Sequence, residues 1–457
     1  MIWSVVGPGT IYQSLSPLHS PLSPNKPAFL LETLVFFITL NSSANRSCLS
    51  TVSMGNCLTT VPMRNCLTKV PLGNFNLLPE EIILDILSRL PTESVFECKL
   101  VSKLWRDLLQ HPSFPRLHCN HLDSAHDSDG KLSFIFYTEG SDEEPFHYTE
   151  YVEKLNRFSR IKMINFRPPF KESYILGSCN GLICFNTRLD NSFYLQPAYI
   201  CNPITREYIV IPNIERKRFL SGFGYIPSTK EYKVVRIYNS KEDPDYGITQ
   251  VYTLGSGIGW RNSRKMDYNV LSFRQLGASA NGAIHWVDSR GSIVAFDLID
   301  EEFRLLSSSP PCSLPAFVEL HVFGGFLCAC HHSIGGFDTW VLRKNKNNHD
   351  VVWSKEFSSS FGEPINFTKS GWLLCYDYRD KHVYRYAPKA SSSRMLVNFG
   401  KSVSIGVSHK NTLVSLKALG EDDTKLMDSG ERASSSGGQK AVIVSQRDRR
   451  KREISGY

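Results

Sequence analysis

The chain has 457 residues, of which 41% are hydrophobic and 21% charged, a length and composition typical of a globular protein with two or three domains. Its net charge of +8 is modest, and no basic stripe with interleaved aromatic residues is present, so nucleic acid is not expected as a partner. The 12 cysteines have no repeating spacing and no CxxC pair, so neither a metal site nor a cofactor is expected. We expect reduced thiols, in a protein of the nucleus, the cytoplasm or both.

Residues 1–74 are predicted to form a disordered or poorly structured extension. The apolar segment 28–40 within it is too short to span a bilayer and contains Glu32, so no integral membrane span is predicted. One Lys and no Arg precede this segment, which argues against a signal peptide. Further on, the residues that follow Met54 fit the N-myristoylation pattern, with Gly55 as the acceptor. That modification requires translation to begin at Met54.

Residues 78–111 predict three short helices. Pro79 suits the first turn of the first helix, and the two glutamates after it complement the positive helix end. Thr92 is placed to cap the second helix and Ser102 to cap the third, which Pro112 ends. Such a module is near the lower size limit for a stable core without a disulfide or a metal.

The apolar stripe of the first helix is broader than this small module can hide. One side of the stripe can face the other two helices, and the other side needs a further partner. Helical periodicity leaves open whether that partner is the rest of the chain or another protein. A DNA-binding helix-turn-helix is disfavoured, because the third helix offers only Lys103 and Arg106 to phosphate groups.

This segment resembles the F-box family over its whole length. The family pattern has a Leu-Pro pair, an amphipathic helix, a second Leu-Pro pair and a Val-Ser-Lys-x-Trp-Arg segment, present here at 78–79, 90–91 and 101–106. Cys98 and Lys99 depart from it, since plant relatives often carry a basic-aromatic-arginine run there. The resemblance implies a Skp-type adaptor as partner and, through it, the cullin of an SCF (Skp–cullin–F-box) ubiquitin ligase. The implied docking residues are Leu78, Pro79, Ile82, Ile83, Leu87, Leu90, Pro91, Leu100, Val101 and Trp105.

From residue 131 to 417 short alternating or apolar runs replace the helical periodicity, which predicts strands. Apolar strands led by small or polar residues begin at 180, 221, 281, 324 and 370, with spacings of 41, 60, 43 and 46 residues. A unit of about 45 residues with up to four strands is typical of a propeller blade. Five units are visible, and a sixth could combine strands from 131–166 with the segment 411–417. A β-sandwich of similar strand content is the competing architecture.

The strand-rich region resembles the F-box-associated domain of plant F-box proteins. Six landmarks carry the resemblance in order across 175–417, among them GSCNGLICF, CNPITREYIVIP, NGAIHWV and FDLIDEEF. The resemblance implies a kelch-like β-propeller that recognises a protein substrate, without identifying the substrate or its binding residues. The predicted architecture is therefore a multidomain α+β chain: an F-box at 75–120, an all-β, propeller-like domain at 131–417, and a disordered basic tail at 420–457.

The residues inside these landmarks also predict purely structural roles. Gly181 and Gly282 permit turns that a side chain would strain. His285 is interpreted as a satisfied core histidine, and Asp297 as a residue that fixes a turn through its side chain. The aromatic residues Trp260, Trp286, Trp340 and Trp353 are interpreted as core or blade-packing side chains. Cys328 and Cys330 precede two histidines and could ligate a metal, but their apolar context favours a buried strand.

No catalytic motif is recognised. The glycine-rich run at 255–259 is followed by neither a lysine nor a helix signal, so it does not predict a phosphate loop, and no GxSxG elbow is present. The prediction is a non-catalytic substrate receptor of an SCF ubiquitin ligase. The alternative is a Skp-bound scaffold or carbohydrate-binding receptor outside a ligase. The run RDRRKRE at 447–453 is either a nuclear signal or a solvated basic tail.

Overall fold

A computed structural model describes residues 79–427, except for short gaps at 112, 130, 139–145, 164–168, 170–172, 189–194, 213–219, 240–246, 269–275, 312–317, 334–335, 345–350, 360–361, 378, 388–392 and 399–402. The predictions for the N-terminal extension, Gly55, Leu78 and the run 447–453 lie outside the described residues. The chain divides into two compact units, one ending at His111 and one beginning at Pro112. Within the described ranges, no helix is long and apolar enough to cross a membrane.

The first unit contains the three predicted helices, which are α2 (Glu80–Ser88), α3 (Thr92–Cys98) and α4 (Lys103–Gln110). Helix α2 begins after Pro79, whose carbonyl accepts hydrogen bonds from the Ile82 and Ile83 amides at 3.0 and 3.2 Å.

The two predicted caps have different outcomes. The Ser102 hydroxyl accepts a hydrogen bond from the Trp105 amide at 3.1 Å, which confirms the predicted cap of α4. The predicted cap of α3 is wrong, because Thr92 is already the first helical residue. Pro91 precedes it, and the Pro91 carbonyl accepts the Val95 amide at 3.1 Å. Proline suits a helix start because its fixed φ is compatible with the first turn.

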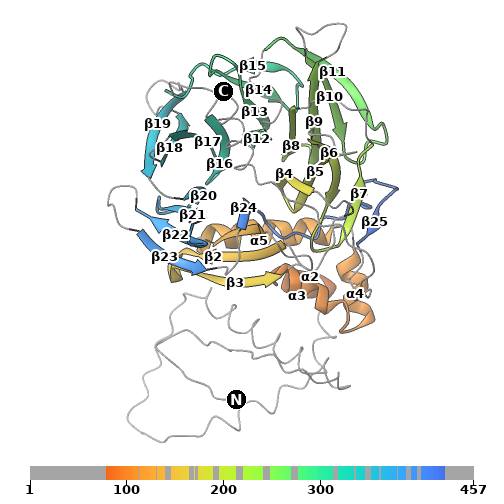
Figure 1. The fold of residues 1–457 in the computed structure, drawn as a ribbon. Coiled ribbons are helices and arrows are strands. Elements are labelled where there is room, and N and C mark those ends of the chain that lie inside the picture. Colours follow the sequence, from red (N-terminus) through yellow and green to blue (C-terminus); the bar gives the residue numbers. More distant parts are fainter. Residues whose placement is uncertain are drawn as a thin grey trace, which may run out of the picture. The chain divides into compact units, whose positions relative to one another are not determined.

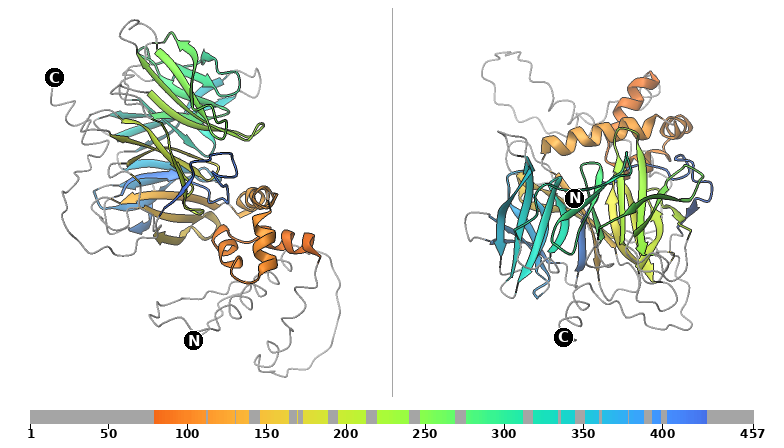
Figure 2. Two further views of the ribbon diagram at one scale, coloured as in Figure 1. Left: turned by 90° about the vertical axis from the view of Figure 1, so that its right-hand side faces the viewer. Right: turned by 90° about the horizontal axis from the view of Figure 1, so that it is seen from above.

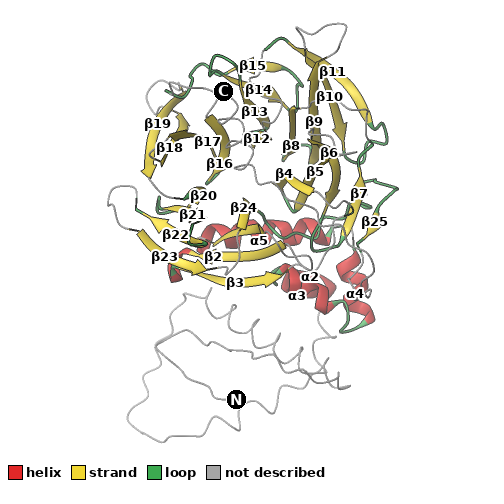
Figure 3. Cartoon of the chain, in the orientation of Figure 1, coloured by secondary structure: helices red, strands yellow, loops and turns green. Residues whose placement is uncertain are grey.

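The second unit opens with α5 (Phe114–Asp129), a helix that was not predicted, and continues with strands (Figure 3). Cys119 of α5 donates its S–H to the Asn180 side-chain carbonyl at 3.6 Å, in the turn that follows β4. Figure 2 shows α5 lying along one face of the strands.

Within the described residues, the strands form six four-stranded groups, each ordered from an inner to an outer strand, and Figure 1 shows these groups around a ring. The first three groups are β24 (Val403–Ser408), β1 (Lys131–Thr138), β2 (Phe146–Val152) and β3 (Arg157–Met163); β4 (Ser173–Cys179), β5 (Leu182–Arg188), β6 (Leu195–Cys201) and β7 (Glu207–Val210); and β8 (Leu220–Ile226), β9 (Glu231–Asn239), β10 (Gly247–Thr253) and β11 (Trp260–Met266). The other three are β12 (Leu276–Ala280), β13 (Ala283–Val287), β14 (Ile293–Asp297) and β15 (Phe303–Leu305); β16 (Val318–Phe323), β17 (Phe326–Ser333), β18 (Gly336–Lys344) and β19 (Val351–Ser359); and β20 (Glu363–Phe367), β21 (Leu373–Asp377), β22 (His382–Tyr386) and β23 (Ser393–Asn398).

The inner strands close the ring. Contacts run from β4 to β8, β12, β16, β20 and β24, and β24 contacts β4 again. This cyclic order is that of a β-propeller and differs from the two stacked sheets of a sandwich. The propeller prediction is confirmed, with one correction. The strand that completes the first blade is β24, which pairs with β1, whereas residues 411–417 form no strand.

Blades three and four approach so closely that β8 and β12 form a short parallel pair, in which Gly222 lies opposite Gly277. A Cβ on either glycine would collide with Ile284 or Trp286. Trp286 is fully buried, which confirms its predicted role as a packing residue.

Most of the other structural readings of the landmarks are also confirmed. Gly181 and Gly282 have φ values of +90° and +77°, as the predicted turns require. His285 is 6% exposed and its Nδ1 forms a hydrogen bond with the Ala278 carbonyl at 3.1 Å. Asp297 accepts the backbone amides of residues 299 and 300, which fixes the turn between β14 and β15. Cys328 and Cys330 are buried in β17, as the apolar context predicted.

Residues 409–427, here called the C-terminal segment, follow β24 and lie against blades two and three. Asn202 donates its side-chain amide to the carbonyls of Thr412 and Val414 at 3.0 and 2.7 Å. Glu421 accepts the Gly255 amide at 2.7 Å. The segment ends with β25 (Lys425–Leu426), which pairs with β7. The β domain therefore extends beyond residue 420, where the tail was predicted to begin.

Candidate functional site

The residues implied by the F-box resemblance separate into an exposed group and a buried group. Ile82 is 47% exposed on α2, and Leu100 is 75% exposed between α3 and α4. Pro79 and Pro91, which precede α2 and α3, are exposed as well. We call these four residues the exposed apolar set.

The buried group consists of Ile83, Leu87, Leu90 and Trp105, with exposed fractions of 0%, 0%, 7% and 2%. These side chains form the core of the unit. Val101 is half-buried and stands between the groups. Leu78 lies just before the first described residue.

Local hydrogen bonds in the turn after α3 hold Leu100 outward. The Lys99 amide donates to the Phe96 carbonyl at 3.3 Å, and the Val101 amide donates to the Cys98 carbonyl at 3.1 Å. The Arg106 guanidinium of α4 donates to the Lys99 carbonyl at 3.3 Å. Because the backbone on both sides of Leu100 is hydrogen-bonded, the position of this residue is defined, and its side chain points to solvent.

The surroundings of the exposed apolar set are polar. Glu80 and Glu81 are exposed in the first turn of α2. Arg89 and Asp85 form an ion pair of 3.0 Å, and both side chains are about half exposed at 56% and 45%. An exposed pair of this kind contributes at most about 0.5 kcal/mol, so the energy available here for binding is mainly apolar. Complete burial of Leu100 alone is worth about 2 kcal/mol.

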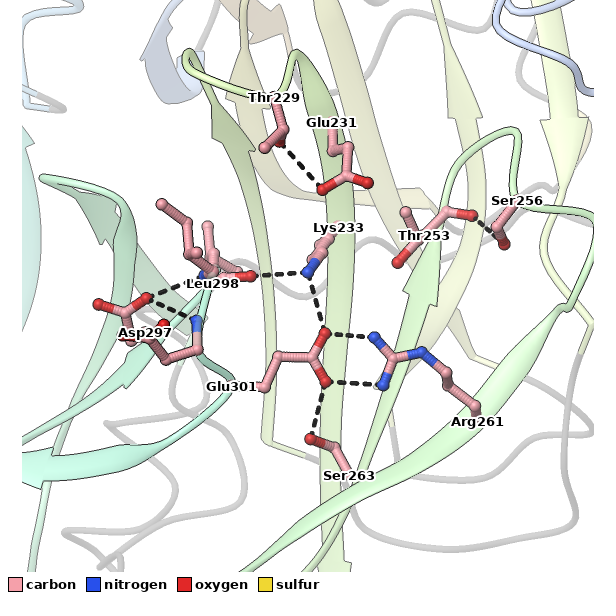
Figure 4. A network of polar contacts seen from close by, with 12 residues as sticks. Thr229, Glu231, Lys233, Thr253, Ser256, Arg261, Ser263, Asp297, Leu298 and Glu301 are labelled. Carbon is pink, nitrogen blue, oxygen red and sulfur yellow. Dashed lines mark hydrogen bonds and ion pairs between the residues drawn. The ribbon is translucent and has the colours of Figure 1, made fainter.

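A second cluster of ionisable groups lies between blades three and four of the propeller (Figure 4). The Glu301 carboxylate accepts a bidentate pair of hydrogen bonds from Arg261, one from Lys233 at 2.9 Å and one from Ser263 at 2.9 Å. Burial raises the pKa of Glu301, but these donors outweigh it and hold the pKa at about 2. Lys233 also donates to the Leu298 carbonyl at 2.7 Å. Both carboxylate oxygens are already engaged, so the cluster clamps two blades together.

A comparable clamp joins the first and sixth blades. Glu153 accepts hydrogen bonds from the Lys369 and Ser370 amides, both at 3.0 Å. Burial raises the pKa of Glu153, and the hydrogen bonds from Ser370, Lys369 and Thr368 lower it further than burial raises it. These carboxylates are structural acceptors. Among the described residues, no group of three or more His, Cys, Asp and Glu side chains could hold a metal ion.

Sequence reasoning missed two features of the second unit. Helix α5 carries start signals in Ser113 and Pro115, but its polar, histidine-rich sequence hides the apolar face. The role of Glu301 as an inter-blade clamp could not be found in the sequence, because its partners are 38 to 68 residues away.

Two family models match this chain in the order of its two units. The F-box domain family matches residues 75–117, and the F-box associated beta propeller domain family matches residues 128–371. F-box protein At3g07870 of Arabidopsis thaliana is 29% identical over 63% of this chain and 73% of its own length. F-box protein At5g65850 of the same plant is 30% identical over 50% of this chain and 56% of its own. Among solved structures, TolB from Acinetobacter baumannii aligns with a TM-score of 0.38 and 11% identity, over 68% of this chain and 74% of that one.

The propeller family alone matches more than half of the chain, and it follows the F-box in the order that the two units show. The chain therefore belongs to the F-box proteins that carry an F-box-associated β-propeller domain.

Proposed function

We propose that this protein is the substrate receptor of an SCF ubiquitin ligase. Its three-helix module binds a Skp-type adaptor, and through that adaptor a cullin, while its propeller binds a protein substrate. The receptor supplies no catalytic group of its own. It raises the effective concentration of a substrate lysine near a conjugating enzyme that other subunits carry.

The observation that supports this proposal most strongly is the exposure of Ile82 and Leu100. The module has enough apolar residues to bury Ile83, Leu87 and Trp105, and it still presents two large aliphatic side chains to solvent. Burial of these two side chains by a partner would remove apolar surface from water, which favours binding. The membership of the F-box family gives the chemistry of the partner.

The non-catalytic role is supported by the acids of the propeller. Both carboxylate oxygens of Glu301 and of Glu153 accept hydrogen bonds from a neighbouring blade, so these two acids are engaged in contacts within the fold. His285 is buried and bonded to a backbone carbonyl, and burial lowers the pKa of its imidazole. These groups serve the fold.

Two experiments test the proposal in sequence. The full chain is first co-expressed with a Skp-type adaptor, and we expect the two proteins to purify as a complex with one copy of each. Absence of a complex contradicts the adaptor assignment. The purified complex is then reconstituted with the remaining subunits of a cullin ligase, the ubiquitin-activating and conjugating enzymes, ubiquitin and ATP, and self-ubiquitination of the receptor is measured with and without the cullin. Cullin-dependent ubiquitin chains support the ligase role, whereas a stable adaptor complex that never supports ubiquitination identifies a scaffold or carbohydrate receptor outside a ligase.

We also propose that the protein acts in the nucleus, the cytoplasm or both. A fluorescent fusion at either terminus tests this, and retention of all the signal in a membrane fraction would contradict it.

A further inference from the structure

Helix α5 is attached to the propeller through a cysteine that lies between two polar partners. The Cys119 sulfur is 3.6 Å from the side-chain oxygen of Asn180 and 3.5 Å from the ammonium nitrogen of Lys410. The thiol therefore donates to the amide and accepts from the lysine. Cys119 lies on α5, Asn180 follows β4, and Lys410 belongs to the C-terminal segment, so the contact joins three separate parts of the chain.

The environment of Asn180 makes this position well defined. The Asn180 side chain donates to the Tyr232 hydroxyl at 2.9 Å, and that hydroxyl donates back to the Asn180 carbonyl at 3.0 Å. Thr412, two residues after Lys410, also donates to the Asn180 carbonyl, at 3.4 Å. These bonds hold Asn180, one partner of the thiol, in place. They also hold the backbone at Thr412, close to Lys410, which is the other partner, so Cys119 and Lys410 meet in a defined geometry.

Most other described cysteines lie in a different setting. Cys184, Cys201, Cys330 and Cys375 are buried in strands, and burial raises the pKa of each thiol. Oxidants act on thiols that are accessible and near positive charge. Cys119 combines partial exposure with an adjacent ammonium group, so it is more open to oxidation than these four buried thiols.

We propose that Cys119 and Lys410 form an oxidant-dependent covalent cross-link. In the first step the sulfur attacks hydrogen peroxide, an S–O bond forms as the O–O bond breaks, and one water leaves, so that the thiol becomes a sulfenic acid. In the second step the Lys410 ammonium loses one proton to solvent, and the lone pair of the resulting amine attacks that sulfur. An S–N bond forms as the S–O bond breaks, and the oxygen leaves as a second water that takes up another amine proton. The sulfur loses two electrons and the peroxide gains them, and the linked pair has two hydrogen atoms fewer than the separate side chains. Condensation of a sulfenic acid with a nitrogen is established chemistry for cysteine.

The cross-link would fix α5 to the C-terminal segment. The two residues are 291 positions apart in the chain, so the link closes a very long loop and restricts the unfolded chain strongly. Thiols can reduce an S–N bond, which makes the link reversible. The proposal does not depend on the ligase assignment, since both residues lie within the propeller unit.

Mass spectrometry of the full chain tests the cross-link. The protein is treated with hydrogen peroxide, digested without reductant, and searched for a peptide pair joined through Cys119 and Lys410 with the loss of two hydrogen atoms. We expect this pair in the wild type and its disappearance after treatment with a thiol reductant. We also expect the midpoint of thermal unfolding to rise by about 5 °C on oxidation.

Two lysine variants separate the cross-link from simple oxidation. Lys410→Arg keeps the positive charge but lacks the amine, so Cys119 should still form a sulfenic acid, which dimedone traps, while the linked peptide and the thermal shift are lost. Lys417→Arg changes an exposed lysine of the same segment and should leave both unchanged.

The proposal is overturned if the wild type yields no linked peptide. It is also overturned if Lys410→Arg shows the same thermal shift, or if peroxide modifies the buried cysteines as fast as Cys119.

Discussion

In the three-helix module, neighbouring aliphatic side chains are divided between core and surface, whereas strand β13 of the propeller is buried along its whole length. Ile82 and Ile83 are adjacent in α2, yet they are 47% and 0% exposed. In the propeller, Ile284 and Trp286 of β13 are both fully buried. The comparison shows that the residues of one family motif can have two roles: some form the core, and others lie exposed on the surface. In the module some of these residues are available to a partner, and in the propeller those that are buried hold the blades together.

The largest effect is expected for Trp286→Ala in the propeller. Trp286 is fully buried against the close approach of β8 and β12, so its removal leaves a large cavity between two blades. We expect a loss of about 3–5 kcal/mol in the free energy of unfolding of this unit, measured by urea denaturation. A loss below about 1 kcal/mol would contradict the packing described for blades three and four.

A smaller loss, about 2–4 kcal/mol, is expected for Leu87→Ala in the helical module, because Leu87 is fully buried in α2. Hydrogen exchange read by mass spectrometry on peptides from residues 80–110 should show faster exchange, while peptides from the propeller strands stay protected. Ile82→Ala serves as the matched control, since Ile82 is half exposed on the same helix. Equal exchange in the two variants would remove the distinction between core and surface in this helix.

Glu301→Gln should lower the free energy of unfolding of the propeller by about 1–2 kcal/mol, after allowance for solvent screening. The pKa of Glu301 is about 2 in the folded protein, below the ordinary value of 4.5, so its contribution is present above pH 4.5 and is lost as the pH falls towards 2. Urea denaturation of the wild type and the variant should therefore differ at pH 7 and converge in strong acid. A difference that is constant with pH would show that the clamp does not depend on the carboxylate charge.

The smallest effect is expected for Arg89→Ala at the edge of the helical module. Arg89 and Asp85 form a solvent-exposed ion pair, and removal of such a pair changes the free energy of unfolding by at most about 0.5 kcal/mol. Hydrogen exchange of α2 should remain close to that of the wild type. A large increase in exchange would mean that the polar rim, and not the buried side chains, holds this helix.

Periodicity and turn chemistry were sufficient to predict much of the fold. The stripe of α2, the cap at Ser102 and the turns at Gly181 and Gly282 depend on neighbours within a few residues, and all of these were predicted correctly. The closing strand was placed wrongly because 411–417 and β24 are both short and apolar, and only the ring geometry decides which of them pairs with β1.

The candidate site could be predicted only in part, for a related reason. The motif named Ile82, Ile83, Leu87 and Leu100 together, and periodicity placed the first three on a single stripe. Their exposure depends on how α2, α3 and α4 pack, which a one-dimensional pattern does not contain. Contacts between distant segments, such as Glu301 with Arg261 and Cys119 with Lys410, left no signal in the sequence.

The most direct test of the account is the affinity of the full chain for a Skp-type adaptor, measured by calorimetry for two matched double variants. Ile82→Asp with Leu100→Asp changes two exposed side chains of the module, and Ile258→Asp with Leu305→Asp changes two exposed side chains of the propeller, at 68% and 47% exposure. We predict that the first pair weakens binding by about 100-fold or more while the hydrogen exchange of α4 stays normal, because two apolar anchors are lost without loss of the core. The second pair should bind as the wild type does. Unchanged affinity for the first pair, in a folded module, would contradict the claim that these exposed residues form the docking site.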